Sequence, residues 1–243
     1  MVTLKINGRQ VKAEAGTTVL NAARENNIYI PSLCENEAIA PYGACRLCLV
    51  EITTAMGRQR LVTSCLYQVE EGLDVQTESE RINRNRRIIL ELLLARCPDA
   101  EVIQDMARRL GVAKTRFPLQ KVHHKCILCA SCARVCEEIV GVSAISLAKR
   151  GVERELTTPF GEDFSEVCIG CGSCAYICPT HAIMLKDANG IRTVKWPHNQ
   201  MEFKLKKCST CGKYWAPEKQ IEYIAKISGT PLTDYDICPD CRE

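Results

Sequence analysis

Sixteen of the seventeen cysteines in this chain fall into four groups of four, and each group has the spacing of a complete metal site. Thiolates spaced as C-x-x-C are the usual protein ligands of iron–sulfur clusters and of zinc. In chain order the groups are Cys34, Cys45, Cys48 and Cys65; Cys126, Cys129, Cys132 and Cys136; Cys168, Cys171, Cys174 and Cys178; and Cys208, Cys211, Cys238 and Cys241. Only Cys97 is left over. A chain with so many sites of this kind is predicted to move electrons.

Composition limits what the rest of the chain can be. Its 243 residues suffice for several small domains, and aromatic residues make up only 5%. We therefore expect the metal sites to serve as cores of small modules. The formal net charge of +3 gives no indication of nucleic-acid binding. No apolar run reaches the roughly eighteen residues of a membrane-spanning helix.

Disulfide bonds are the alternative explanation for so many cysteines. A secreted chain would begin with a basic and then apolar signal segment, but residues 1–9 alternate like a strand that runs into a turn. We therefore expect reduced thiols and a cytoplasmic location.

Residues 1–78 predict a small α+β domain around the first cysteine group. Apolar and polar residues alternate on both sides of Asn7-Gly8, a pair typical of a tight hairpin turn. A short helix over 19–25 follows, with Thr17 or Thr18 as its cap, and further strands are expected beyond the cysteine loop. Two strands, a helix and then a cysteine loop resemble a β-grasp ferredoxin.

The sequence after residue 78 predicts a helical linker and two further cysteine-containing domains. Residues 79–121 hold no complete group and predict a helical linker, in which Ser79 caps the first helix and a second helix stops at Gly111. The first of these helices is expected to turn four arginines to water, either as a solvated face or as a contact for an acidic partner: Arg81, Arg84, Arg86 and Arg87. Residues 122–196 hold the second and third groups as a pseudo-repeat. Residues 197–243 hold the fourth group in a small lysine-rich module.

The first group has the spacing C-x10-C-x2-C-x16-C. Four thiolates suit a [2Fe–2S] cluster with two ligands on each iron, and Gly43 lets the backbone fold closely around the inorganic sulfides. A zinc site is the alternative, which the predicted strands around the cysteines disfavour. Here the chain resembles the N-terminal domain of the complex I large iron–sulfur subunit and of the diaphorase subunits of NAD-dependent hydrogenases and formate dehydrogenases.

The second and third groups share the spacing C-x2-C-x2-C-x3-C, and Pro179 follows the last cysteine. In two-cluster ferredoxins with this run, the fourth cysteine of each run ligates the cluster of the other run. The rule predicts two interlocked [4Fe–4S] sites. One takes Cys126, Cys129, Cys132 and Cys178, and the other takes Cys136, Cys168, Cys171 and Cys174. The residues after Cys136 are also similar to the subunits named above, so the resemblance covers roughly residues 1–190.

One part of the family pattern is missing. Subunits of the complex I type usually carry another cluster between these domains, bound by one histidine and three cysteines. This chain has Cys97 where the histidine falls, and the three cysteines that should follow are absent, so we expect no cluster there. Cys97 itself is predicted to be a small buried hydrophobe. Electrons leaving the [2Fe–2S] site would then pass directly to a [4Fe–4S] site or through a partner.

The fourth group has the spacing C-x2-C-x26-C-x2-C, which is typical of a zinc ribbon. Four thiolates in a closed tetrahedron leave no open catalytic position. Mononuclear, rubredoxin-like iron and a further cluster are the alternatives, because spacing alone does not separate the metals.

The sequence offers no recognisable site for a nicotinamide or a flavin, because it has no Gly-rich turn after a strand and no Walker-type loop. Clusters carry single electrons, and a flavin is needed to split a hydride pair. We therefore predict an electron-transfer subunit of a multisubunit, flavin-dependent NAD(P)H oxidoreductase, without catalytic residues of its own. A flavoprotein would be one partner and a further redox subunit or ferredoxin the other, with electron bifurcation as one option. A free polyferredoxin-type carrier and a protein with purely structural clusters are the alternatives.

Overall fold

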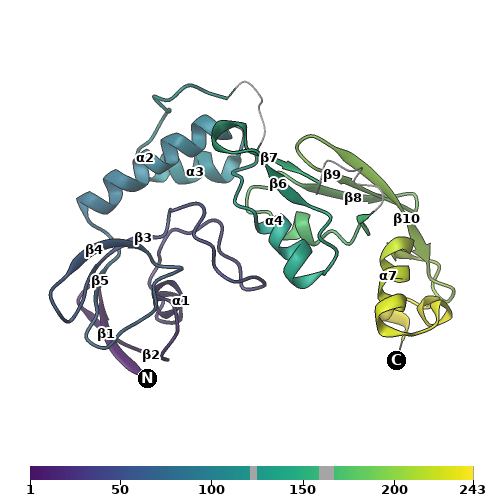
Figure 1. The fold of residues 1–243 in the computed structure, drawn as a ribbon, viewed down its shortest axis with the longest axis horizontal. Coiled ribbons are helices and arrows are strands. Elements are labelled where there is room, and N and C mark those ends of the chain that lie inside the picture. Colours follow the sequence, from purple (N-terminus) through teal and green to yellow (C-terminus); the bar gives the residue numbers. More distant parts are fainter. Residues whose placement is uncertain (121–124, 159–166, 243) are drawn as a thin grey trace. The chain divides into compact units, whose positions relative to one another are not determined.

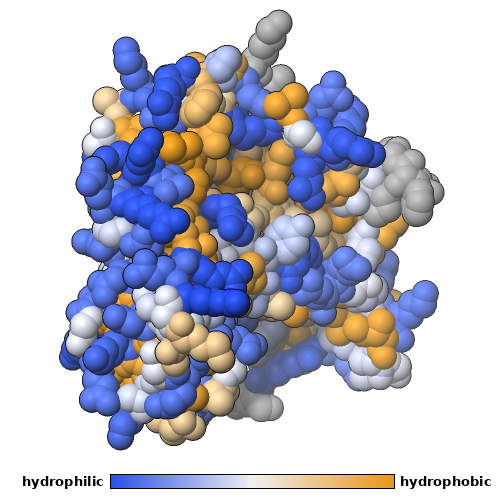
Figure 2. All heavy atoms as spheres, turned by 60° about the vertical axis from the view of Figure 1, so that its left-hand side comes forward, coloured by the Kyte–Doolittle hydropathy of each residue, from blue (hydrophilic) through white to orange (hydrophobic). Residues whose placement is uncertain are grey.

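The computed structural model describes residues 1–120, 125–158 and 167–242, and it divides into two compact units, Met1–Cys129 and Ala130–Glu243 (Figure 1). Both units mix helices and strands, which agrees with the predicted α+β class at this level. Hydrophilic residues cover much of the face seen in Figure 2, and hydrophobic residues reach that surface between them. In the described part of the chain, no helix is long and apolar enough to cross a bilayer.

The first unit opens on a five-stranded sheet with strand order β2-β1-β5-β3-β4. The predicted hairpin at Asn7-Gly8 is confirmed, because β1 and β2 pair antiparallel on either side of it. β5 runs parallel to β1 and antiparallel to β3, so it joins this hairpin to the second one, β3–β4. The strands are β1 (Val2–Ile6), β2 (Arg9–Ala13), β3 (Leu49–Thr53), β4 (Gln59–Thr63) and β5 (Asp74–Gln76).

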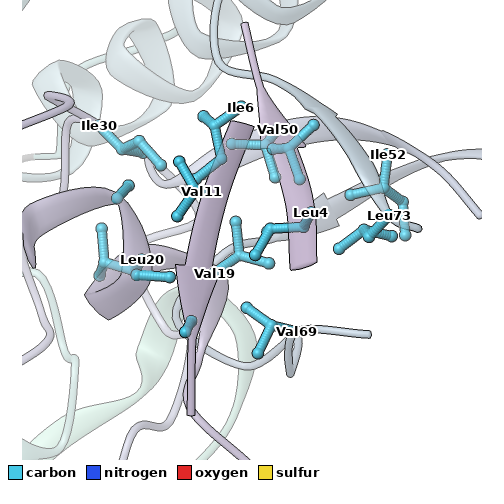
Figure 3. Packing of buried hydrophobic residues seen from close by; sticks show 14 of the residues in the cluster. Leu4, Ile6, Val11, Val19, Leu20, Ile30, Val50, Ile52, Val69 and Leu73 are labelled. Atoms are coloured by element: carbon cyan, nitrogen blue, oxygen red, sulfur yellow. The ribbon is translucent and has the colours of Figure 1, made fainter. Parts of the chain in front are cut away.

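Helix α1 (Val19–Glu25) packs against this sheet through the unit's main core. Its cap is Thr18, one of the two residues predicted for this role, and the Thr18 hydroxyl accepts a hydrogen bond from the Asn21 N–H at 3.2 Å. Figure 3 shows core side chains from the strands and from α1 pointing toward one another. Cys48 and Cys65 belong to the same buried cluster, so the core that holds the sheet together also fixes two of the cysteines.

Two helices follow the sheet, where the sequence predicts a helical linker. α2 (Glu80–Arg96) packs against α3 (Glu101–Arg109) and against β3. The predicted cap is confirmed, because the Ser79 hydroxyl accepts a hydrogen bond from the Ile82 N–H at 3.1 Å. The predicted end of the second helix is also confirmed, since α3 stops two residues before Gly111.

The prediction for Arg86 was wrong, because this side chain does not face water. It is 2% exposed and donates hydrogen bonds to the carbonyl oxygens of Leu47 at 3.1 Å and Leu49 at 2.7 Å. These carbonyls flank Cys48, so Arg86 ties the cysteine loop to α2. Burial lowers the pKa of the guanidinium, and the two carbonyls compensate for its lost hydration. The other three arginines of the predicted face are exposed: Arg81, Arg84 and Arg87.

The second unit is built from short elements around the later cysteines. Its main sheet is antiparallel, with strand order β11-β10-β9-β8, and β6 and β7 form a separate hairpin. The strands are β6 (Ser146–Ala148), β7 (Glu155–Thr157), β8 (Met184–Ala188), β9 (Ile191–Lys195), β10 (Gln200–Lys207) and β11 (Tyr214–Pro217). The helices are α4 (Ser131–Arg134), a π-helical turn (Val135–Ile139), α6 (Ser173–Tyr176), α7 (Glu218–Ser228) and 3-10 turns at Gly151–Glu153, Leu232–Tyr235 and Pro239–Cys241.

The predicted domain boundary between residues 196 and 197 falls inside this sheet. β9 and β10 lie on either side of it and pair antiparallel over five residues of each strand, from Ile191↔Lys204 to Lys195↔Gln200. The four-domain division of the chain stays a prediction.

Candidate metal centres

The structure gathers the four cysteines of the first group in the loop before β3 and the turn after β4. All four are buried, at 7% exposed or less. They form two pairs: the Cys48 and Cys65 sulfurs lie 3.3 Å apart, and the Cys45 N–H donates to the Cys34 Sγ at 3.3 Å. Two pairs of thiols are what a [2Fe–2S] cluster needs, with two ligands on each iron. The residues present therefore fit that cluster.

Hydrogen bonding inside each pair separates the pKa values of its two thiols. The hydrogen bond with Cys34 lowers the pKa of Cys45 to about 6, and the bond with Cys65 lowers that of Cys48 to about 7. The same bonds, together with burial, raise the pKa values of Cys34 and Cys65. Because the thiolate is the metal ligand, one member of each pair is ready to bind near neutral pH.

A small cavity in the second unit is lined by four thiols, Cys136, Cys168, Cys171 and Cys174. This is the set that the exchange of fourth cysteines predicts for one [4Fe–4S] site. Cys136 belongs to the earlier run, yet it lies with the first three cysteines of the later run. The rest of the wall is mostly apolar and includes Val194 and Trp196. Four sulfur donors around one apolar cavity fit a [4Fe–4S] cluster.

Burial controls the acidity of these thiols. It raises the pKa of Cys168 to about 11 and that of Cys174 to about 12, and it also raises the pKa of Cys136. Backbone N–H donors oppose the shift: Gly170 at Cys168, and Ala144 at Cys136 at 3.3 Å. Without a metal these thiols stay protonated, so the positive charge of bound iron is required to hold them as thiolates.

The two cysteine runs share an unusual backbone. The second residue after the first cysteine has a positive φ in both runs, 55° at Leu128 and 69° at Gly170. The residue after the second cysteine does too, with φ of 66° at Ala130 and 85° at Gly172. A short helix begins directly afterwards in each run, α4 in one and α6 in the other. The pseudo-repeat seen in the sequence is therefore also a repeat of conformation.

The other predicted [4Fe–4S] set is divided between the two units. Cys126 and Cys129 belong to the first unit, and Cys132 and Cys178 to the second. In the first unit the Leu128 N–H approaches the Cys126 Sγ at 3.4 Å, and in the second the Ala182 N–H donates to the Cys178 Sγ at 3.2 Å. Each half is thus supplied with N–H donors, and the complete set stays a prediction.

The fourth group forms the tightest set of thiols. The sulfurs of Cys208, Cys211, Cys238 and Cys241 all lie within 4.8 Å of one another. Across residues 1–120, 125–158 and 167–242, no other set of three or more His, Cys, Asp or Glu ligands is so close. Backbone N–H groups point at the Cys208 sulfur and lower its pKa to about 6, which favours the thiolate that a metal binds.

Cys97 is fully buried, as predicted. Its thiol donates to the Leu93 carbonyl oxygen at 3.0 Å, and burial raises its pKa to about 12. These are the properties of a small core residue rather than of a reactive thiol.

Comparison with known domain families places two iron–sulfur domains on this framework. Residues 1–80 match a 2Fe-2S iron-sulfur cluster binding domain, and residues 167–213 match a 4Fe-4S dicluster domain. The second match includes Cys208 and Cys211, but the structure gathers these two thiols with Cys238 and Cys241.

Several named proteins have sequences similar to this chain. The chain is 35% identical over 209 residues to the NADPH-Fe(3+) oxidoreductase subunit alpha of Geobacter sulfurreducens, covering 76% of this chain and 24% of that protein. It is 33% identical over 209 residues to an NADH-quinone oxidoreductase subunit of Rhizobium meliloti, with the same two coverages. It is 30% identical over 213 residues to the NADP-reducing hydrogenase subunit HndD of Solidesulfovibrio fructosivorans. This match covers 76% of this chain and 36% of that protein. The chain is a homologue of these subunits.

A solved structure supports the same relationship. An NAD+-reducing [NiFe]-hydrogenase in the H2-reduced state contains a chain that superposes with a TM-score of 0.64 at 27% identity. The match covers 74% of this chain and 85% of that one. The chain spans only about a quarter to a third of the curated relatives it matches, which are longer proteins.

Sequence reasoning missed two side chains that support the sites. Arg86 holds the first cysteine loop, and Trp196 lines the four-thiol cavity. The signal for Trp196 was its rarity, since the chain has only two tryptophans. Arg86 gives no such signal, because its neighbours in sequence include three exposed arginines.

Proposed function

We propose that this chain is the iron–sulfur electron-transfer subunit of a multisubunit, flavin-dependent NAD(P)H oxidoreductase. It would relay single electrons between a flavoprotein partner and a further redox subunit or ferredoxin, in the cytoplasm. Clusters supply one-electron chemistry when bound, and a flavin in the partner would split hydride pairs. The observation that carries the proposal is the cavity where Cys136 lies with three cysteines of the other run. Homology to subunits named as NAD(P)H oxidoreductases adds the partner class.

Each cysteine group has an assigned role in this proposal. The proposed ligands are Cys34, Cys45, Cys48 and Cys65 for [2Fe–2S]; Cys126, Cys129, Cys132 and Cys178 for one [4Fe–4S]; Cys136, Cys168, Cys171 and Cys174 for the other; and Cys208, Cys211, Cys238 and Cys241 for zinc. The proposed domains are a β-grasp domain over 1–78, a helical linker over 79–121, a two-cluster ferredoxin domain over 122–196 and a zinc-ribbon-like module over 197–243.

The packing of the first unit supports a direct route between the first two redox sites. Cys34 and Cys45 of the [2Fe–2S] set and Cys129 of a [4Fe–4S] set belong to one buried apolar cluster. Side chains of α2 and α3 complete this cluster. The route therefore needs no cluster at Cys97, which is itself a buried member of the same group.

Sulfur spacing supports a single metal ion at the fourth group. A tetrahedral ion with Zn–S bonds of roughly 2.3 Å places its sulfurs about 3.8 Å apart. The Cys211 and Cys238 sulfurs lie 3.7 Å apart, and the whole set lies within 4.8 Å. A four-iron cluster would need its ligands spread more widely. Rubredoxin-like iron has the same geometry as zinc, so metal analysis must separate these two.

Purification from the native host under anaerobic conditions tests the proposal. We expect the chain to co-elute with a flavin-containing protein that oxidises NAD(P)H, and to hold about ten iron atoms and one zinc ion. A free polyferredoxin would instead elute as a monomer without flavin, and that result would overturn the subunit assignment. The electron acceptor of the isolated complex, ferredoxin included, would then show whether bifurcation takes place.

A further inference from the structure

We propose that Tyr223 is a positioning residue that couples the fourth cysteine group to the [4Fe–4S] site of Cys136, because its hydroxyl holds the turn that follows this cysteine. A metal ion bound at the fourth group thereby slows the release of iron from the [4Fe–4S] site. This inference rests on the proposed function in one respect, since both sites must hold their metals. The class of partner and the direction of electron flow do not enter.

Tyr223 of α7 reaches a segment that lies 83 residues earlier in the chain, within the same unit. Its hydroxyl donates a hydrogen bond to the Val140 carbonyl oxygen at 3.0 Å. The next residue is Gly141, whose φ is 75°, and a Cβ there would lie 3.1 Å from the same hydroxyl oxygen. Glycine at this position therefore permits both the left-handed turn and the close approach of the tyrosine.

The turn that receives this hydrogen bond wraps around Cys136. The N–H groups of Val142 and Ser143 donate to the Cys136 carbonyl oxygen at 3.0 and 3.2 Å. The Ala144 N–H donates to the Cys136 Sγ at 3.3 Å. Val140 and Val142 also line the cavity of the four thiols. Because one short stretch of chain supplies both the cavity wall and a donor to the sulfur, a hydroxyl that fixes Val140 also fixes the surroundings of Cys136.

The position of the tyrosine depends on the fourth cysteine group. β11 and α7 lie inside the 26-residue segment between Cys211 and Cys238, whose sulfurs are 3.7 Å apart. A metal ion bound by both cysteines closes this segment into a loop, which stabilises the folded segment relative to the unfolded chain. α7 also packs against the 3-10 turn Leu232–Tyr235, which leads to Cys238. The metal therefore stabilises the helix that carries Tyr223.

Helix α7 has different contacts on its two sides. It packs against β10 and β11, and its buried residues are Ile221 and Ala225, which lie one turn apart on the same side. Tyr223 is two residues from each of them, so it lies about 200° around the helix from Ile221. One side of α7 is thus held by its own module, and the opposite side carries the hydroxyl that binds the turn after Cys136. The helix connects the two sites.

Tyr223→Phe tests the contact, because phenylalanine keeps the ring and removes the hydroxyl. Iron release from the full chain to ferrozine is followed anaerobically, with EPR of the reduced protein reporting each cluster. We expect the [4Fe–4S] signal that is absent in Cys136→Ala to disappear about two- to tenfold faster, the range that the loss of one hydrogen bond gives, and the other signals to keep their rates. Tyr235→Phe is the matched control, because the Tyr235 hydroxyl bonds to Thr230 at 2.7 Å inside the same module. An unchanged rate in Tyr223→Phe, or an equal acceleration in Tyr235→Phe, would overturn the proposal.

A double-mutant cycle with Cys241→Ala tests the dependence on the fourth metal. Cys241→Ala removes one of the four thiols, and we expect it to lose that metal and to release iron faster from the same [4Fe–4S] site. Tyr223→Phe added to Cys241→Ala should cause no further acceleration, because both changes break one connection. If the two accelerations multiply in the double variant, the coupling is wrong and Tyr223 acts only locally.

Hydrogen exchange of Tyr223→Phe covers the case in which Cys241→Ala does not fold. We expect the amides of residues 142–144, which bond to Cys136, to exchange faster while the fourth metal is retained. Unchanged exchange of these amides would overturn the role of Tyr223 alone. A native protein that lacks [4Fe–4S] clusters, or lacks a metal at the fourth group, would overturn the proposed function as well.

Discussion

The two C-x2-C-x2-C runs adopt one backbone conformation but reach it with different residues. The later run has glycine at both left-handed positions, and the earlier run has Leu128 and Ala130 there. A left-handed conformation costs an L-residue about 1–2 kcal/mol, so the earlier run stores strain that the later run avoids. A Cβ in the later run would also meet neighbouring side chains, the Phe203 ring at Gly170 and the end of the Leu185 side chain at Gly172.

A second difference concerns how each site is completed. The later run finds all four of its predicted thiols inside one unit, under the sheet β8–β10. The predicted set of the earlier run is divided between two units. Identical ligand spacing thus occurs in two different settings: one predicted set lines a single cavity of the second unit, and the other predicted set draws cysteines from both units. The ligand determines which metal is bound, and the surrounding residues tune its potential.

The largest effect is expected from removing an exchanged ligand. Cys136→Ala should lose the iron of the site under the sheet, roughly four iron atoms per chain, although Cys136 belongs to the earlier run. Cys178→Ala should instead disturb the other [4Fe–4S] site. Paired variants separate the two outcomes: Cys136→Ala with Cys168→Ala should lose no more iron than Cys136→Ala alone, whereas Cys136→Ala with Cys126→Ala should lose the iron of both [4Fe–4S] sites. The reverse pattern would show that each run ligates its own cluster.

Cys97→Ala is the matched control for these two variants, because Cys97 is another buried cysteine. We expect its iron content to equal that of the native protein. Loss of iron in this variant would place a metal ligand at Cys97 and contradict the account of a core residue.

A methyl group at Gly170 should have the next largest effect. Gly170→Ala combines a positive φ with a Cβ 2.6 Å from the Phe203 ring, and we expect a loss of about 3 kcal/mol. The measurement is the guanidinium midpoint at which cluster absorbance is lost. A midpoint equal to that of the native protein would show that the sheet does not lie closely on this loop.

The opposite change in the earlier run should have the opposite sign. Ala130→Gly removes a Cβ at φ 66°, and we expect a gain of about 1 kcal/mol in the same denaturation assay. If Ala130→Gly destabilises the protein, the packing of the Ala130 methyl group outweighs its strain, and the comparison between the two runs loses its energetic basis.

The smallest effect is expected from weakening the ion pair between Arg192 and Asp187. Asp187→Asn removes the charge that pairs with Arg192 at a half-exposed position, so we expect less than about 1 kcal/mol. The measurement is again the guanidinium midpoint, which should change less than in Gly170→Ala. A larger change in Asp187→Asn than in Gly170→Ala would show that the contact of Arg192 with the Gly170 carbonyl oxygen, rather than the close fit of Phe203, holds this loop.

Local patterns predicted much of this fold. The Asn7-Gly8 hairpin and the caps at Thr18 and Ser79 follow from residue type and period, and the structure has them all. Cysteine spacing grouped Cys136 with the first three cysteines of the later run, and these four thiols line one cavity, although their role as ligands of one cluster stays a prediction. These features depend on neighbours in sequence or on a fixed ligand rule, and so a single sequence is enough to find them.

Long-range contacts could not be predicted in this way. Arg86 has the periodicity of a surface arginine, and only the carbonyls near Cys48 explain its burial. Trp196 lies at a shift in composition that suggested a domain boundary, but the pairing of β9 with β10 places it over the thiols. The left-handed backbone at Leu128 could not be predicted from the sequence either, because glycine is the residue type that indicates this conformation.

Reversible reduction of the cysteine sites tests the central claim most directly. An anaerobic EPR-monitored redox titration of the full native chain should resolve one [2Fe–2S] and two [4Fe–4S] signals, each fitting a one-electron curve in both the reductive and the oxidative direction. Clusters that are destroyed on reduction, or that cannot be reduced, would contradict an electron relay and assign the cysteine groups a purely structural role.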